Sequence, residues 1–242
     1  MGTRQHPPAD LILIMNYALD IDRAITLALN GSESLFWDNL MVCVTNTFSW
    51  SLVIVMLLYI FFHNNTLRDA FIILLTIGLM ILVADRLCSG LVKPWVARWR
   101  PTQDPEIMYL VDMVEGYRGG RFGFFSGHAC NTFCMATFLS FLFRHRAVTI
   151  TLYFWSVTTT FTRLYLGVHY FGDVTVGLLV GILIGWAFYR LYQWLMKRVG
   201  TPRYVTDQST PTGYRKADMN FFLAVVFFNY IIVLLVSMCR GV

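Results

Sequence analysis

The chain has 242 residues, of which 57% are hydrophobic and only 14% charged, with a mean hydropathy of +0.57. A soluble domain usually carries about 25% charged residues. The composition therefore argues against an ordinary soluble protein and indicates one embedded in a lipid bilayer. The net charge of +5 fits anionic lipid headgroups. Because the sequence contains no nucleic-acid-binding motif, we expect no nucleic acid partner.

Residues 1–34 are expected to form a polar N-terminus followed by an amphipathic helix. Met1–Ala9 is polar and contains proline, and we expect it to be disordered. Leu11–Leu29 has apolar residues at helical spacing, with Asp20, Asp22 and Arg23 in its middle. Spanning the bilayer would bury those charges at a high free-energy cost. We therefore expect this helix to lie at the membrane interface rather than to cross it.

Six later stretches are long and apolar enough to be considered as bilayer spans. Only helices and closed barrels satisfy the backbone in lipid, and runs of this length are helical. We predict an all-α, multi-pass membrane bundle with a main domain at residues 35–199, a polar loop at 200–218 and a final transmembrane helix at 219–242. The six predicted spans are Phe36–Phe62, Phe71–Val92, Gly127–Phe143, Ala147–Leu166, Val174–Met196 and Met219–Cys239.

The cysteines do not indicate a disulfide framework or a metal site. All five fall inside or at the ends of apolar stretches, and none pairs in the loop pattern of a secreted fold. Cys130 and Cys134 share a helix face, but two thiols alone do not make a zinc site. We interpret the cysteines as small packing residues and expect no metal and no other cofactor.

Six spans would place two polar segments, residues 93–126 and 162–173, at the same membrane face. The numbers of cations at the two faces do not decide the orientation. The cationic linkers Arg144–Arg146 and Lys197–Lys216 have no evident chemical role, so they favour their own side as cytoplasmic. We therefore expect the two polar segments to lie on the extracytoplasmic face of the cell (inner, cytoplasmic) membrane.

The first polar segment begins with two cations at a membrane edge. Lys93 and Arg100 are seven residues apart, which is two turns of a helix, so both would point the same way, and Pro101 would end that helix. Arginine offers a planar fork to phosphate oxygens, and lysine offers a compact charge. The alternative is a pair of cations that extend to water from the end of a span.

Ser126-Gly127-His128 follows a glycine-rich stretch and opens an apolar helix. Serine is a good N-cap, and the free backbone N–H groups at a helix start bind anions. Gly127 would let an oxyanion approach the backbone closely. His128, in the first turn, could protonate a departing alkoxide. The alternative is a capping serine followed by a packed histidine.

The third segment is the most specific of the three. Arg163 supplies another phosphate fork, and His169 and Asp173 are four residues apart, so they would share one face of a helix. A carboxylate bonded to one ring nitrogen fixes the tautomer and leaves the other nitrogen free to attack phosphorus. Surrounding cations would stabilise the charge that spreads over the phosphoryl oxygens. A purely structural His169–Asp173 ion pair is the alternative.

The order and spacing Lys-x6-Arg-Pro, Ser-Gly-His and Arg-x5-His-x3-Asp resembles the motif set of the type 2 phosphatidic acid phosphatase (PAP2), or lipid phosphate phosphatase, superfamily. That superfamily includes bacterial membrane enzymes acting on phosphatidylglycerol phosphate, undecaprenyl diphosphate and lipid A. It shares its site with vanadium-dependent haloperoxidases. The resemblance covers about residues 85–195, and it implies that residues 35–199 are a PAP2-like catalytic domain that needs no metal.

The resemblance also implies a role for each matching residue. His169 would be the nucleophile and form a phosphohistidine, Asp173 would orient and polarise it, and His128 would be the general acid for the leaving group. The phosphate would be held by Lys93, Arg100, Ser126, the Gly127 N–H and Arg163. Two positions depart from the family pattern. Phe125 stands where the family usually has proline before Ser-Gly-His, and Thr162 stands where it usually has serine.

Two further cations, Arg118 and Arg121, flank a glycine pair just before Ser126. They could contact a second phosphate or a sugar headgroup and so influence substrate choice. The alternative is ordinary loop charge paired with Asp112 or Glu115.

The leading function is an integral membrane phosphatase that hydrolyses a phosphomonoester or diphosphate on a lipid headgroup. Candidate substrates are undecaprenyl diphosphate, phosphatidylglycerol phosphate, phosphatidic acid and a lipid A phosphate. One alternative is a vanadate-dependent, haloperoxidase-like oxidase, which the membrane spans disfavour. Another is a non-catalytic lipid-binding protein on the same scaffold, which the intact His128, His169 and Asp173 disfavour.

Overall fold

The computed structural model describes residues 8–240, so the polar residues 1–7 lie outside the described part of the chain, as do 241–242. Within the described residues there are two isolated β-bridges and no strand, which confirms the all-α prediction. The helices are α1 Ala9–Ala28, α2 Leu35–Thr45, η1 Thr47–Trp50, α3 Ser51–His63, α4 Leu67–Asp85, η2 Arg86–Val92, α5 Lys93–Val96, η3 Pro101–Gln103, η4 Val114–Gly116, α6 Gly127–Phe143, α7 Arg146–Tyr165, α8 Phe171–Val199 and α9 Lys216–Cys239.

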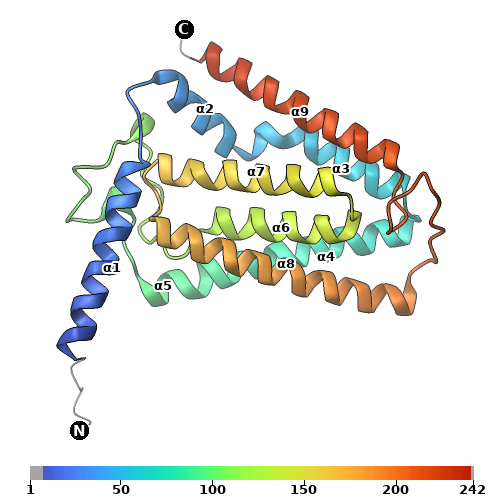
Figure 1. The fold of residues 1–242 in the computed structure, drawn as a ribbon, viewed down its shortest axis with the longest axis horizontal. Helices are drawn as coiled ribbons and strands as arrows, with labels where there is room; N and C mark the ends of the chain where they lie inside the picture. Colours follow the sequence, from blue (N-terminus) through green and yellow to red (C-terminus); the bar gives the residue numbers. More distant parts are fainter. Residues whose placement is uncertain (1–7, 241–242) are drawn as a thin grey trace.

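Helices α6 and α7 lie in the middle of the bundle, with α4 and α8 on one side of them and α3 and α9 on the other (Figure 1). Helix α6 packs most extensively against α8 and α7. Most α6 side chains are buried in protein. A helix enclosed in this way does not need the hydrophobicity of one that faces lipid, which explains the Thr, Ser and Asn residues in both central helices.

A stripe of glycines brings α8 against α6. A Cβ on Gly177, Gly181 or Gly185 would lie 2.5–2.6 Å from a backbone carbonyl oxygen of α6 or of its N-cap residue, so only glycine permits this approach. Small residues at every fourth position are typical of closely packed membrane helices. The contact also joins the two helix starts, since the Ser126 N–H donates to the Asp173 carbonyl at 2.9 Å. The stripe consists of Gly177, Gly181 and Gly185.

The described residues contain three helices long and apolar enough to cross a membrane, or four if one bent pair counts as a span. The predicted number of six is therefore not confirmed. Helices α6 and α7 are outside this set because α6 has only 17 residues and α7 is rich in threonine. The three helices are Leu67–Val96, Phe171–Val199 and Lys216–Cys239.

The first predicted span, Phe36–Phe62, is not one continuous helix. Helix α2 and the η1–α3 segment meet at a 70° bend. Asn46 causes the break, because its backbone is extended and its side chain accepts a hydrogen bond from the Phe48 N–H at 3.0 Å. The bend turns Thr45 toward the end of the bundle where the motif residues gather.

Helix α1 projects away from that same end of the bundle (Figure 1). It is not among the helices that could span a membrane. Leu13, Ile14 and Tyr17 are each at least 65% exposed. Placement of α1 at the membrane interface, as the sequence predicts, would give these apolar side chains a lipid environment.

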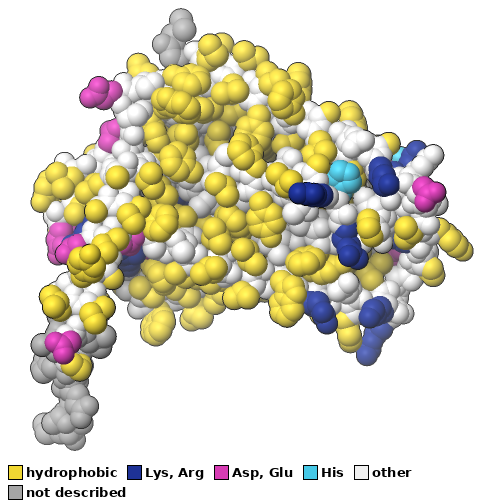
Figure 2. Space-filling view, viewed as in Figure 1, with side chains coloured by type: hydrophobic (Ala, Val, Ile, Leu, Met, Phe, Trp, Pro, Cys, Tyr) yellow, Lys and Arg dark blue, Asp and Glu magenta, His cyan; other side chains and the backbone are white. Residues whose placement is uncertain are grey.

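Charge is distributed unequally along the bundle. Figure 2 shows an apolar surface over the middle of the molecule, with Lys and Arg side chains gathered where α8 ends and α9 begins. Most Asp and Glu side chains visible on this face lie at the opposite end, around α1.

Candidate active site

The motif segments meet at one end of the bundle, which agrees with the prediction that the polar segments 93–126 and 162–173 lie at the same membrane face. The start of α6, the end of α7 and the start of α8 all lie there, next to the segment that follows α5 (Figure 1). Lys93 and Arg100 do not share a helix, contrary to the prediction. Helix α5 ends at Val96 because Ala97 is left-handed, with φ 51°. The chain then runs extended, with the Arg100 N–H donating to the Arg121 carbonyl at 3.3 Å.

Arg100 reaches the third motif from this extended segment. Its side chain is buried, and its Nη1 donates to the Val168 carbonyl at 2.9 Å and lies 3.2 Å from His169 Nε2. Burial and the nearby positive charge of Arg163 lower the pKa of Arg100. Two buried guanidinium groups that repel each other favour an anion between them.

Arg163 is anchored by residues from two other elements. Its Nη1 donates to Thr45 Oγ1 at 2.6 Å, and its Nη2 donates to the Tyr117 hydroxyl at 3.3 Å. Burial would raise the pKa of Tyr117, but the hydrogen bond and charge of Arg163, with the charge of Arg100, lower it. Among the described residues, neither Arg100 nor Arg163 has a hydrogen-bond partner for its buried Nε. Both can therefore still donate to an oxyanion.

The start of α6 completes the cationic pocket. The Ser126 hydroxyl accepts from the Ala129 N–H at 3.4 Å, which is the predicted N-cap. A Cβ on Gly127 would lie 4.0 Å from Lys93 Nζ, so the lysine ammonium lies over the exposed backbone at the helix start. A positive helix end and an ammonium group together form an anion-binding site.

His169 and Asp173 are adjacent at the start of α8. His169 precedes the helix, and its Nδ1 lies 3.5 Å from Asp173 Oδ2, a contact longer than a strong hydrogen bond. Both side chains are buried. Asp173 Oδ2 also accepts from the Tyr170 N–H at 3.1 Å. This geometry directs Nδ1 toward the carboxylate and Nε2 toward Arg100.

The environment of His169 favours its neutral form. Burial, reinforced by the charges of Arg100, Arg163 and Lys93, holds the pKa of His169 well below its usual value. An imidazole that remains unprotonated at neutral pH keeps a lone pair for attack. Of these three predicted phosphate-binding cations, Arg100 directly contacts the ring, at 3.2 Å from Nε2.

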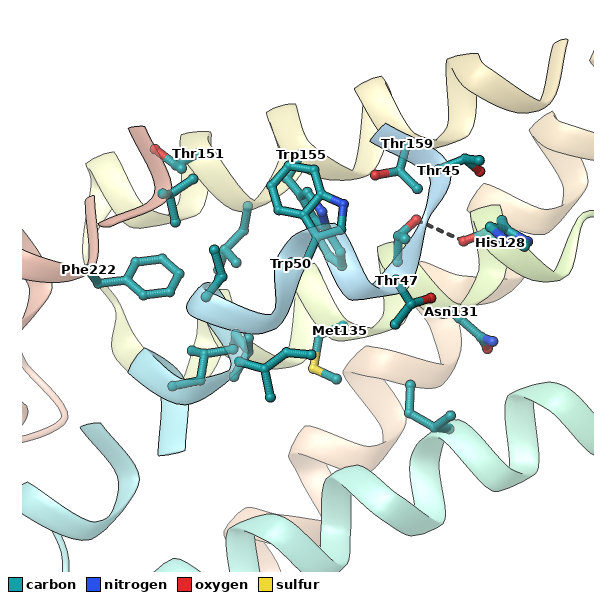
Figure 3. Close-up of a pocket in the computed structure, with 18 residues that line it drawn as sticks. Thr45, Thr47, Trp50, His128, Asn131, Met135, Thr151, Trp155, Thr159 and Phe222 are labelled. Carbon is teal, nitrogen blue, oxygen red and sulfur yellow. Dashed lines mark hydrogen bonds between the residues drawn. The ribbon is translucent and has the colours of Figure 1, made fainter. Parts of the chain in front are cut away.

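His128 lies at one end of a cavity of about 340 Å³ (Figure 3). The cavity runs between the bent α2–α3 pair, α6, α7 and α9, and reaches Phe222 at its other end. Its lining is mainly apolar, and Trp50, Met135 and Trp155 lie along its length. Its volume is within the range of small-molecule sites. His128 thus links the cationic cluster of the motif residues to an apolar cavity inside the bundle.

Arg118 and Arg121, the two cations expected to influence substrate choice, lie in the loop that precedes Ser126. Both are exposed, and Arg121 stacks over Trp99, with 4.5 Å between its Cζ and the ring centroid. Among the residues that the structure describes, no ion pair joins Arg118 or Arg121 to Asp112 or Glu115, and Glu115 lies 3.9 Å from Arg240 instead. Phe125, the departure from the family pattern, is buried, and its carbonyl accepts from Cys88 Sγ at 3.2 Å.

Sequence reasoning did not find four residues that contact the site. Thr45 and Tyr117 carry no sequence signal, because they reach Arg163 through the bend after α2 and through a loop. Arg98 binds Asp173, at 2.8 Å from Nη1 to Oδ1, and Asp22 binds Arg98. A signal for Asp22 exists, since charges in the middle of an apolar helix usually have partners.

Comparison with known proteins places this chain in a family. The model of the PAP2 superfamily matches residues 73–197. A lipid A 4'-phosphatase of Bacteroides thetaiotaomicron is 40% identical over 77% of this chain and 83% of its own length. A lipid A 4'-phosphatase of Porphyromonas gingivalis is 33% identical over 76% and 78%. The chain belongs to the PAP2 superfamily, which confirms the resemblance found in the motifs.

More distant relatives agree with the fold. Phosphatidylglycerophosphatase B of Bacillus subtilis is 28% identical over 70% of this chain and 82% of its own. The crystal structure of a transmembrane PAP2-type phosphatidylglycerolphosphate phosphatase from Bacillus subtilis superimposes with a TM-score of 0.57, at 24% identity, over 76% of this chain and 89% of that one. The helical bundle described here is therefore the fold of a PAP2 membrane enzyme.

Proposed function

We propose that the protein is an integral membrane phosphatase that hydrolyses a lipid phosphate through a phosphohistidine on His169. The observation that carries this proposal is a cluster of three cations whose charges act on both motif histidines, one of which also lines the apolar cavity. The haloperoxidase-like alternative is disfavoured by the membrane helices, and a non-catalytic role is disfavoured by the presence of intact His128, His169 and Asp173.

The first chemical step is transfer of the phosphoryl group to the protein. Lys93, Arg100 and Arg163 hold the phosphate oxygens and stabilise the charge that develops on them. His169 Nε2 forms a bond to phosphorus while the bond from phosphorus to the lipid oxygen breaks. His128 donates a proton to that oxygen, so the lipid leaves as an alcohol.

The second step regenerates the enzyme. His128, now neutral, accepts a proton from a water molecule as its oxygen attacks phosphorus, and the bond between phosphorus and Nε2 breaks. Inorganic phosphate leaves, and His169 returns to its neutral form. Asp173 keeps the Nδ1 proton of the ring directed away from phosphorus throughout. None of these roles requires a metal ion.

We further propose that an acyl chain of the substrate enters the apolar cavity next to His128. The cavity lies inside the bundle and its lining is mainly apolar, which suits a lipid tail rather than a soluble leaving group. The headgroup would remain at the end of the bundle, where Arg118 and Arg121 are exposed. In this arrangement all six predicted spans cross the cell membrane, and the site lies on its extracytoplasmic face.

Lipid A carrying a 4'-phosphate is the substrate that we favour. Both relatives named lipid A 4'-phosphatase align over more than three quarters of this chain. Phosphatidylglycerol phosphate is a second candidate, because the 28% identical relative bears the name phosphatidylglycerophosphatase B.

The test is release of inorganic phosphate by purified protein in detergent. The panel contains lipid A phosphorylated only at the 4' or only at the 1 position, phosphatidylglycerol phosphate, phosphatidic acid and undecaprenyl diphosphate. We expect the 4'-phosphate to be released fastest and His169→Ala to release none. Fastest release from phosphatidylglycerol phosphate would favour the second candidate, and no release from any lipid would refute the phosphatase assignment.

A further inference from the structure

Helix α1 caps the start of α8 from outside. The Phe171 N–H donates to Thr26 Oγ1 at 3.0 Å, and the Gly172 N–H donates to Asp22 Oδ1 at 2.7 Å. These are among the first N–H groups of α8, which have no partner within their own helix. A Cβ on Gly172 would lie 3.0 Å from Asp22 Oδ2, so an alanine there would displace the carboxylate by a few tenths of an ångström.

The same Asp22 carboxylate holds an arginine that binds Asp173. Arg98 Nη2 donates to Asp22 Oδ2 at 2.6 Å, and Arg98 Nη1 donates to Asp173 Oδ1 at 2.8 Å. The guanidinium also stacks over the Tyr170 ring, at 4.0 Å from the centroid. Burial would lower the pKa of Arg98, but the two carboxylates raise it, so Arg98 stays charged. A continuous chain of contacts therefore runs from Asp22 through Arg98 and Asp173 to His169.

The charges around this chain explain what Asp22 contributes. Without Asp22, the full positive charge of Arg98 would act on Asp173 and reduce the negative charge available to His169. With Asp22 present, that charge is shared between two carboxylates. The charged and titratable groups that face the Asp173–His169 pair are Asp22, Lys93, Arg98, Arg100, His128, Arg163 and Tyr170.

We propose that Asp22 is a positioning residue for phosphoryl transfer, acting through Arg98 on Asp173. The inference rests on the proposed function. It extends the catalytic unit to a helix outside the family match, which begins at residue 73. Helix α1 is then part of the active site as well as an element at the membrane surface.

Asp22→Asn is the informative variant, because the amide oxygen can still accept from Gly172 while the charge next to Arg98 is lost. We expect kcat on the best lipid of the panel to fall about tenfold, with KM little changed, since Asp22 reaches the site only through Arg98 and is not among the proposed phosphate-binding groups. We also expect the acidic limb of the kcat/KM profile to move to lower pH, because a lost negative charge disfavours protonated His169. Asp20→Asn is the matched control, since Asp20 is exposed on the same helix and, among residues 8–240, pairs only with Arg23, at 3.7 Å.

Two further variants separate positioning from folding. Arg98→Gln combined with Asp22→Asn should lower kcat no more than Arg98→Gln alone, because Asp22 acts through Arg98. Gly172→Ala pushes the Asp22 carboxylate away without changing any charge, and it should lower kcat in the same direction. These two variants remain informative if Asp22→Asn folds poorly.

The outcomes also distinguish this inference from the function on which it rests. If the wild type releases no phosphate from any lipid, the proposed function fails. If the wild type is active and His169→Ala is inactive, but Asp22→Asn keeps the wild-type kcat and pH profile, only the role of Asp22 is refuted. A lower melting temperature with unchanged kcat and pH profile would likewise refute it, because it would show that Asp22 only caps α8.

Discussion

At the scale of single residues, the site depends on burial as much as on residue type. His169 is an ordinary histidine in sequence, but it is buried among three cations that keep its imidazole neutral. Arg100 and Arg163 are both buried and close enough to influence each other. An anionic phosphate would relieve the repulsion between these cations, so binding of substrate and stabilisation of the transition state have the same electrostatic origin.

The lowered pKa of His169 predicts activity in mildly acidic solution. The kcat/KM profile reports groups of the free enzyme. Because the folded pKa lies below the usual value of about 6.5, the acidic limb assigned to His169 should lie below that pH. The free energy of unfolding should also decrease as the pH falls from about 6.5 toward the pKa of folded His169. Over that range the unfolded chain binds a proton that the folded site does not.

Arg100→Gln should move the acidic limb of the kcat/KM profile to higher pH, because the substitution removes a positive charge that lowers the pKa of His169. Measurement of both proteins on one substrate cancels the ionisation of the substrate itself. Arg118→Gln is the control, since Arg118 is exposed and is not among the cations that act on His169. A wild-type limb near pH 6.5 that does not respond to Arg100→Gln would contradict this account.

The motif residues were predictable from sequence because their spacing is fixed by the chemistry. The residues that hold them were not. Thr45 approaches Arg163 only because the chain bends at Asn46, and Asp22 approaches Arg98 across 76 residues of sequence. Such long-range contacts depend on tertiary packing, which leaves no periodic signal in the chain.

At the scale of helices, the α6–α8 contact fixes the distance between the phosphate-binding helix start and the His169–Asp173 pair. The all-α fold and most helix bounds could be predicted, because apolar runs are long and punctuated by polar loops. The break between α2 and α3 could not, since an asparagine in an apolar run does not by itself end a helix. Likewise, Lys93 and Arg100 fit a helical spacing, but Ala97 ends the helix between them.

Gly181→Ala should destabilise the protein and lower its activity. The added Cβ would lie 2.5 Å from the Cys130 carbonyl oxygen, so α8 must move away from α6. Overpacking of this kind typically costs about 1–3 kcal/mol. Thermal unfolding in detergent measures the effect. Gly78→Ala on α4 is the matched control, because its Cβ would have no neighbour within 4 Å. Equal melting temperatures for the two variants would exclude a tight α6–α8 contact.

The cavity beside His128 predicts a variant that distinguishes long-chain from short-chain substrates. Met135→Trp places a larger ring in the slot that we assign to an acyl chain. We expect kcat/KM for lipid A to fall about tenfold, which corresponds to about 1.4 kcal/mol, while hydrolysis of a water-soluble short-chain phosphate changes little. Met135→Leu, which keeps the volume, should behave as wild type. Equal losses on both substrates would place the acyl chain elsewhere.

At the scale of the whole molecule, the apolar surface and the separation of charge define a direction across the membrane. The cations gather where α8 ends (Figure 2), and the helix starts that carry the motif histidines lie at the opposite end of the bundle (Figure 1). Positive residues favour the cytoplasmic side. A site that faces outward would then meet lipids of the extracytoplasmic leaflet.

Cysteine labelling in spheroplasts measures this orientation. In a Cys239→Ala background, Tyr109→Cys, in the polar segment 93–126, should react with a membrane-impermeant maleimide in intact spheroplasts. A cysteine at Tyr204, in the cationic linker, should react only after lysis. Both side chains are more than 70% exposed, so access depends on the side of the membrane. The reverse pattern would place the active site in the cytoplasm.

Transfer of phosphate to His169 is the central claim, and capture of the labelled intermediate tests it most directly. Purified enzyme is mixed with lipid A carrying a ³²P-labelled 4'-phosphate and quenched rapidly in alkali, which preserves phosphohistidine. We predict label on the wild-type protein that is lost in acid and maps to the peptide containing His169, and no label on His169→Ala. Turnover without labelled protein, or equal labelling of His169→Ala, would contradict the account.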